Sequence, residues 1–181
     1  MLPKTHKTAA VIIPPNDLWP PIQAIRKKHD RQLRRWMPHI TLIYPFRPLQ
    51  EFTDLAEQFA RACRKVTPFE IQLNKLGYFE HGRGNYTIWL APHPEESVIQ
   101  LQSILRSIVP DCDDVNRFAS GFAPHLSVGQ VKGPSRLAEL THRLNELWKS
   151  VSFVVREVNF VWRDDPPDDI FRPAQTVKLS G

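Results

Sequence analysis

Two short motifs in the sequence place a hydroxyl residue two positions after a histidine. One is PHITL, which contains His39 and Thr41, and the other is PHLSV, which contains His125 and Ser127. Residues i and i+2 of a β-strand project from the same face of a sheet. If each motif lies on a strand, each strand presents one imidazole and one hydroxyl to a common side, with apolar residues on the opposite face.

An imidazole pair is suited to acid–base chemistry on a phosphate ester. The unperturbed pKa of histidine lies near neutrality, so one neutral ring can accept a proton from the attacking water or hydroxyl. A second, protonated ring can donate a proton to the departing oxygen. Hydroxyl groups can donate hydrogen bonds to the non-bridging phosphate oxygens. We therefore expect His39 and His125 to be catalytic, and Thr41 and Ser127 to bind the phosphate.

This chemistry requires neither a metal ion nor a cofactor, and we expect none. Cys63 and Cys112 are the two cysteines, and neither has a CxxC or other ligand-like spacing. The acidic segment RDDPPDD lacks the glycine and the regular alternation of a calcium loop, so we expect a solvated turn. Its acidic residues are Asp164, Asp165, Asp168 and Asp169.

The number of places in the sequence that fit the motif depends on how strictly its pattern is defined. The loose pattern of a histidine, any residue, a hydroxyl and an apolar residue also fits His6 and Thr8. The stricter pattern, with a preceding proline and an apolar residue between, is met only at His39 and His125. Either histidine alone would more often be structural, but a matched pair favours function.

Apolar periodicity predicts alternating strands and helices along the chain. The expected strands cover about 8–13, 39–46, 69–79, 85–91, 122–130, 151–162 and 174–179. One helix is expected to begin at Asn16 or Asp17. Three further helices are expected over about 51–66, 95–107 and 134–149.

The two halves of the sequence repeat this order. Each half has a strand, a helix, a strand opening with Pro-His, a helix and a further strand, which indicates an internal duplication. We expect one α+β domain over 1–181, with two lobes about a pseudo-twofold axis. The lobes would cover roughly 8–80 and 85–180, with terminal elements exchanged or shared, and the two motif strands would lie side by side.

Composition and net charge limit the compartment and the partners that we expect for this protein. The net charge is +5, and no apolar run approaches the length of a membrane span. The few cysteines and the absence of a leader-like segment predict a cytoplasmic protein with no membrane partner. The basic run over 26–35 is expected on a helix, either as a solvated face or as an attraction for a polyanion such as RNA, without DNA sequence readout.

Several further residues have two interpretations. Tyr44 and Phe46 have the parity of the apolar face, so we expect them in the core rather than stacked on a base. Trp89 could stack on a base or pack in the core. His81 and Arg83 lie in a predicted loop, where solvation is favoured over phosphate contact.

The motifs PHITL and PHLSV resemble the paired signature of the 2H phosphoesterase superfamily, which includes 2′-5′ RNA ligase-like proteins and cyclic phosphodiesterases. The resemblance covers essentially the whole chain. It implies a concave antiparallel sheet in each lobe, outer helices and a central groove that holds both motifs. It also implies catalysis by His39 and His125, and phosphate binding by Thr41 and Ser127.

The function that follows is metal-independent hydrolysis of 2′,3′-cyclic phosphates or 2′-5′ phosphodiester bonds, on RNA ends or nucleotides. Reversible 2′-5′ RNA ligase activity is the second possibility, since it differs mainly in which hydroxyl attacks. A module that binds RNA or nucleotides without turnover is the non-enzymatic alternative.

Overall fold

The computed structural model describes residues 2–117 and 121–181, which form two four-stranded antiparallel sheets. The strand order is β2-β1-β7-β8 in the first sheet and β5-β4-β3-β6 in the second. The strands are β1 (Thr8–Ile12), β2 (Ile40–Ile43), β3 (Phe69–Glu80), β4 (Asn85–His93), β5 (Leu126–Lys132), β6 (Val151–Val155), β7 (Glu157–Trp162) and β8 (Arg172–Lys178). The α+β class and the paired sheets agree with the sequence-based expectation.

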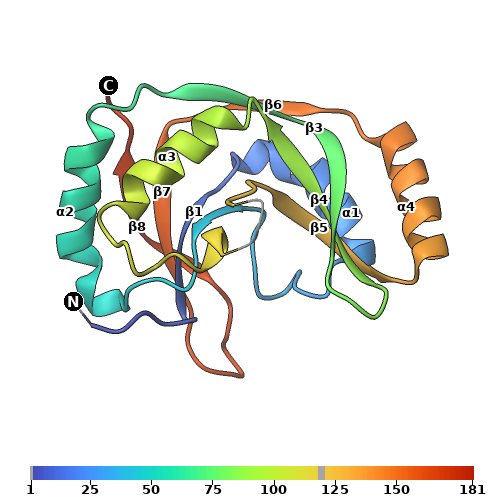
Figure 1. Cartoon of the computed structure of the whole chain (residues 1–181), viewed down its shortest axis with the longest axis horizontal. Helices are drawn as coiled ribbons and strands as arrows, with labels where there is room; N and C mark the ends of the chain where they lie inside the picture. Colours follow the sequence, from blue (N-terminus) through green and yellow to red (C-terminus); the bar gives the residue numbers. More distant parts are fainter. Residues whose placement is uncertain (1, 118–120) are drawn as a thin grey trace.

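Four α-helices accompany the sheets: α1 (Trp19–His29), α2 (Phe52–Cys63), α3 (Glu96–Arg106) and α4 (Pro134–Leu147). Prolines open α1 and α4, where the missing amide proton has no helical partner to lose. Figure 1 shows α2 at one end of the long axis and α4 at the other, with α1 beside β5. No helix of the described residues is long and apolar enough to cross a membrane.

The segment expected as one strand over 151–162 is two strands, which corrects the prediction. The break falls at Arg156, and β6 pairs with β3 in the second sheet while β7 pairs with β1 in the first. The buried positions change parity across the break, from Phe153 and Val155 to Val158 and Phe160. The chain thereby passes from one sheet to the other, which an apolar pattern alone does not reveal.

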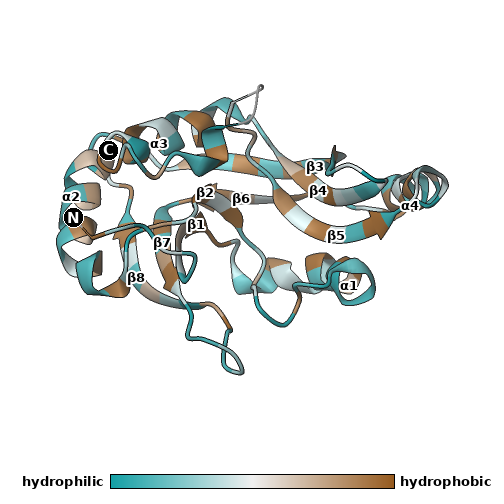
Figure 2. Cartoon of the chain, turned by 60° about the horizontal axis from the view of Figure 1, so that its bottom comes forward, coloured by the Kyte–Doolittle hydropathy of each residue, from teal (hydrophilic) through white to brown (hydrophobic). Residues whose placement is uncertain are grey.

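The main core lies between the sheets and the helices α2, α3 and α4. Phe46 is fully buried there and contacts Phe52, Phe59 and Phe160, as expected for a core residue. The outer faces of the helices are hydrophilic, and the strands alternate between hydrophilic and hydrophobic residues (Figure 2). This alternation leaves one face of each motif strand available for polar residues.

The basic run over 26–35 does not form one helical face, which corrects the expectation of a single helix there. Helix α1 ends at His29, and the following residues form turns. Arg26 is 2% exposed, so its charge faces the interior rather than solvent. The run therefore divides into side chains with different surroundings.

Candidate active site

The two motifs lie at corresponding places in the two sheets. His39 immediately precedes β2 and His125 immediately precedes β5, and each of these strands is the edge of its sheet. The two edge strands contact one another, so the motif strands lie side by side as expected. Thr41 pairs with Val11, and Ser127 pairs with Trp89.

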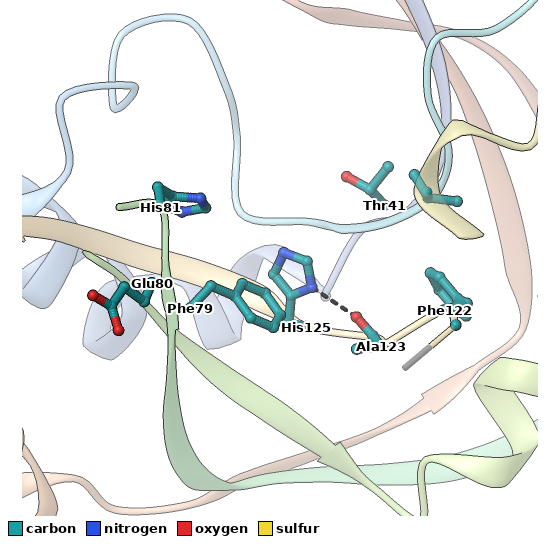
Figure 3. Close-up of a pocket in the computed structure, with 9 residues that line it drawn as sticks. Thr41, Phe79, Glu80, His81, Phe122, Ala123 and His125 are labelled. Carbon is teal, nitrogen blue, oxygen red and sulfur yellow. Dashed lines mark hydrogen bonds between the residues drawn. The ribbon is translucent and has the colours of Figure 1, made fainter. Parts of the chain in front are cut away.

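Both histidines make the same hydrogen bond to the backbone. The Nδ1–H of His39 donates to the carbonyl oxygen of Met37 at 2.8 Å, and the Nδ1–H of His125 donates to that of Ala123 at 2.8 Å (Figure 3). A carbonyl oxygen can only accept, so the proton of each neutral ring lies on Nδ1. Each Nε2 then carries the lone pair and is the nitrogen that can exchange a proton with substrate.

Aromatic rings hold the two imidazoles in place. Trp36 stacks on His39 with centroids 4.3 Å apart and planes 19° apart, and Phe171 stacks on Trp36 at 3.5 Å. The edge of Phe79 meets the ring of His125 at 4.8 Å, with the planes at 83°. These three aromatic residues were not among the residues predicted for the site. Only Trp36 gives a local signal, since it lies three positions before His39.

Burial controls the protonation of both rings. The pKa of His39 is lowered to about 4, chiefly by desolvation and also by the charge of Arg26, while the backbone hydrogen bond to Met37 opposes the shift. Burial also lowers the pKa of His125. Both rings are therefore neutral near pH 7 before an anion binds, and each can accept a proton at Nε2.

A cavity of about 300 Å³ opens beside His125. Thr41 reaches it from β2, while Phe79 and His81 reach it from the end of β3 and the adjoining turn (Figure 3). Its described lining is Thr41, Phe79, Glu80, His81, Val115, Gly121, Phe122, Ala123 and His125. The cavity thus brings one predicted histidine and one predicted hydroxyl together. His39 and Ser127 lie outside its lining.

His81 is solvated as expected, whereas the position of Tyr44 differs from expectation. His81 is exposed but borders the cavity, and its Nε2 lies 2.9 Å from Oγ1 of Thr87. Arg83 stays exposed in its turn. A bulge at β2 makes Ile43 pair with Ala10 of β1, and the changed parity keeps Tyr44 out of the main core. Tyr44 is instead half-buried beside Trp36.

Trp89 packs on the floor of the second sheet. Its ring lies over Gly77 of β3, where a Cβ would overlap the indole. It also lies 5.0 Å from Phe79 and 6.1 Å from His125, measured between ring centroids. Trp89 is half-buried, whereas its neighbours Ile88 and Leu90 point to the opposite face of β4 and lie in the main core. Trp89 is therefore part of the wall beside His125 rather than of the core, and base stacking stays a prediction.

The sequence and the fold of this chain have counterparts among known proteins. Residues 14–167 match the family described as the 2′-5′ RNA ligase superfamily. The chain belongs to this superfamily, the 2H phosphoesterases. It is 30% identical to the RNA 2′,3′-cyclic phosphodiesterase of Methanothermobacter thermautotrophicus over 140 residues, which is 70% of each protein.

Two solved structures share the 2H phosphoesterase fold. The structure of E. coli LigT complexed with 3′-AMP has a TM-score of 0.65 and 18% identity, over 99% of this chain and 100% of that one. A protein of Thermus thermophilus has a TM-score of 0.65 and 19% identity, over 96% and 98% of the two chains.

In this 2H phosphoesterase, a buried ion pair links α1 to both motifs. Arg26 donates from Nε to Oδ2 of Asp30 at 2.7 Å and from a terminal guanidinium nitrogen to the carbonyl oxygen of Trp36 at 2.9 Å. Oδ1 of Asp30 accepts from Nε2 of Gln130 on β5 at 3.1 Å. Trp36 stacks on His39, and β5 begins after His125, so the network connects the supports of both rings.

The acidic segment is exposed at Asp164, Asp165 and Asp168, as expected for a solvated turn, but a second ion cluster buries its last aspartate, Asp169, which corrects the prediction at that residue. Asp169 is 1% exposed and is bound by Arg34 and by Arg35, the latter at 2.6 Å. The hydrogen bond from Arg34 holds the pKa of Asp169 below its usual range. Phe171 follows closely, and its N–H donates to the carbonyl oxygen of Arg35 at 2.9 Å. The cluster thereby places Phe171 against Trp36.

Among the residues that the structure describes, no three His, Cys, Asp or Glu side chains are grouped so that they could hold a metal ion. The acidic segment is a case in point, because Asp168 pairs with Arg172 and Lys7 pairs with Asp165. The described side chains that line the cavity include imidazoles, a hydroxyl, aromatic rings and the carboxylate of Glu80.

Proposed function

We propose that this 2H phosphoesterase hydrolyses 2′,3′-cyclic phosphates at RNA ends or on nucleotides, with His39 and His125 as the acid–base pair. The observation that carries the proposal is the matched tautomer of the two rings. Each Nδ1–H is bound to the carbonyl two residues earlier, which leaves each Nε2 to exchange a proton. The 30% identical relative that is named an RNA 2′,3′-cyclic phosphodiesterase supports the substrate class.

The roles of the two histidines follow from the cavity. His125 lines the cavity that would hold the terminal nucleoside, so its Nε2 is placed to protonate the departing ribose oxygen. His39 immediately precedes the neighbouring strand β2, and its Nε2 would remove a proton from the attacking water. A new P–O bond forms to water and one P–O bond to the ribose breaks, which gives a phosphomonoester. After this step His39 holds one extra proton and His125 has lost one, so the transfer of one proton from His39 to His125 restores the starting state.

A bound substrate would favour the protonated form of His125, which this ring needs in order to act as an acid. Burial keeps this ring neutral before binding, because it lowers the pKa. A bound phosphodiester anion next to the ring favours its protonated form and raises its pKa. Thr41 and Ser127 would donate hydrogen bonds to the non-bridging oxygens, and Thr41 already borders the cavity.

The terminal base would occupy the apolar part of the cavity. Phe79 and Phe122 line this part, and a cavity of about 300 Å³ has room for a nucleobase and its ribose. Stacking on an aromatic ring is tolerant of base identity. We therefore expect weak selectivity among the four bases.

The test is turnover of the four nucleoside 2′,3′-cyclic phosphates in EDTA. We expect His39→Ala and His125→Ala to lower kcat each by about 10²–10⁴-fold while KM changes little. His142→Ala is the matched control, since this histidine lies on α4 with a 78% exposed side chain. Full activity in either motif variant would refute the assignment of the pair.

The alternatives give different results in the same experiment. Binding of a cyclic phosphate without turnover by the wild type would indicate a non-catalytic nucleotide-binding module. Turnover of 2′-5′ linked oligonucleotides, with none of the cyclic phosphates, would indicate that the ligase-type transesterification is the reaction of this site.

A further inference from the structure

The α1–α4 groove is a second concave surface, at the far end of β5 from His125. It consists of two adjoining hollows of about 460 and 330 Å³, which share His29 and Arg143. Figure 1 and Figure 2 both show α1 and α4 at the same end of the molecule, with β5 running between them. We propose that this groove binds the sugar–phosphate backbone of a single-stranded RNA whose 3′ end lies in the active site. The proposal rests on the proposed function and extends it from nucleotides to RNA chains.

The charge of the groove is strongly one-sided. Its lining contains one carboxylate, Glu139, against five basic side chains: Lys28, Lys132, Arg136, Arg143 and Lys149. All five are exposed. Within the described part of the chain, none of the five has a carboxylate at ion-pair distance. A concentration of uncompensated cations in a concave surface is what a polyanion requires.

These cations come from three separate elements. Lys28 lies on α1, Lys132 ends β5, and Arg136 and Arg143 lie on α4. Gly129 permits their approach, because a Cβ at this position would lie 2.6 Å from the Cβ of His29. The fold therefore assembles a charge cluster that neither helix has alone. The charge cluster also affects His29: burial lowers the pKa of this histidine, and the charges of Arg143 and Lys28 add to the decrease.

The groove also has an apolar floor of the kind that unpaired bases need. Leu147 is 70% exposed at the end of α4, and Trp148 beside it is half-buried. The Nε1–H of Trp148 donates to the carbonyl oxygen of Leu73 at 2.8 Å, which fixes the orientation of its ring. Proteins that bind single strands combine cations along the backbone with apolar or aromatic surfaces for the bases.

Strand β5 joins the groove to the active site. His125 borders the cavity, whereas Gln130 and Lys132 border the groove. At the rise per residue of a β-strand, these two residues lie about 17–23 Å along the chain from His125. Gln130 pairs with Thr87, whose hydroxyl contacts the cavity residue His81. An RNA that leaves the cavity past His81 therefore enters the groove at Lys132, with the chain running toward its 5′ end.

The test compares two substrates in two matched triple variants. The groove variant is Lys132→Glu/Arg136→Glu/Arg143→Glu, and the control is Arg61→Glu/Arg64→Glu/Lys65→Glu. The control residues are exposed and lie on or directly after α2, at the opposite end of the molecule (Figure 1). Both variants change the net charge equally. The substrates are a nucleoside 2′,3′-cyclic phosphate and a single-stranded RNA of about ten nucleotides that ends in the same group.

We expect the groove variant to lower kcat/KM for the RNA by about 10–100-fold and to leave that for the mononucleotide unchanged, because only the RNA reaches the groove. The slope of log K against log salt should fall by about 2 for three lost phosphate contacts, at about 0.7 per contact on a single strand. The control should change neither value beyond a small general charge effect. Equal losses in the two variants, or no loss for RNA, would overturn the proposal.

Binding of an RNA that ends in a 3′-phosphate, followed by fluorescence anisotropy, separates this proposal from the catalytic one. If the wild type turns over neither substrate but the groove variant still weakens RNA binding, the proposed hydrolysis fails and the groove stands. If the groove variant also loses mononucleotide turnover, the single variants Arg136→Glu and Arg143→Glu replace it, with the same selective loss expected.

Discussion

The protonation of His39 gives a prediction whose size follows from the structure. Its pKa is about 4 in the folded protein, against 6.5 for an unperturbed histidine in the unfolded chain. Between these two values the unfolded state binds a proton that the folded state does not. Acidification therefore favours unfolding, and stability that is present above pH 6.5 is lost progressively as the pH falls toward 4.

The full difference corresponds to about 3 kcal/mol, of which up to about 1.8 kcal/mol falls between pH 7 and pH 5. The side chain is not fully enclosed, and solvent near it reduces the figure, so we expect about 1–2 kcal/mol over this interval. The variant His39→Gln removes the titrating group and keeps a similar size. It should therefore lose less stability than the wild type on going from pH 7 to pH 5, by this amount.

Urea unfolding of both proteins at pH 7 and pH 5 measures the difference directly. His125 titrates in both proteins, so its contribution cancels in the comparison. His142→Gln, on the surface of α4, is the control and should follow the wild type. Identical pH dependence of wild type and His39→Gln would refute the argument that burial keeps this ring neutral.

Three substitutions test the supports of the site. Trp36→Ala removes the ring stacked on His39, and we expect a loss of about 2–4 kcal/mol in urea unfolding together with a fall in kcat. Arg26→Met leaves the carboxylate of Asp30 buried without its partner, with an expected loss of about 3–5 kcal/mol by urea unfolding. Restoration of much of this stability by adding Asp30→Leu would confirm that the unpaired charge is the cause. Gly129→Ala forces the backbone of β5 away from α1, and we expect a loss of about 1–3 kcal/mol, measured in the same way; a stability equal to wild type would show that the close approach is not required.

The helices and the edge strands of the site are local features, and the sequence predicted them. The Pro-His motifs marked the starts of β2 and β5, and the parity of i and i+2 predicted a shared face for His39 and Thr41. Such features depend on backbone preferences and on the side-chain period of a strand, which act over a few residues. The expected strands differ from the observed ones by a few residues at their ends, as for the strand expected over 39–46 and observed as Ile40–Ile43.

Tyr44 and Asp169 show where local reasoning stops. A bulge in β2 changes the parity after Thr41, because Ile43 rather than Leu42 pairs with Ala10 of β1, and the alternation of apolar residues does not reveal this. Asp169 is buried because Arg34 and Arg35, more than a hundred positions earlier, neutralise its carboxylate. The sequence of the acidic segment contains no trace of these partners.

The sequence by itself predicted the chemistry that we propose for this protein, from two histidines and two hydroxyls in matched motifs on strands of matched order. Tertiary structure alone decided what surrounds them. It assigned β6 and β7 to different sheets, stacked Trp36 on His39 and Phe171 on Trp36, and gathered cations from α1, β5 and α4 into one groove. The reason is that residue type and spacing fix local geometry, whereas burial, pKa and charge density depend on which distant segments the fold brings together.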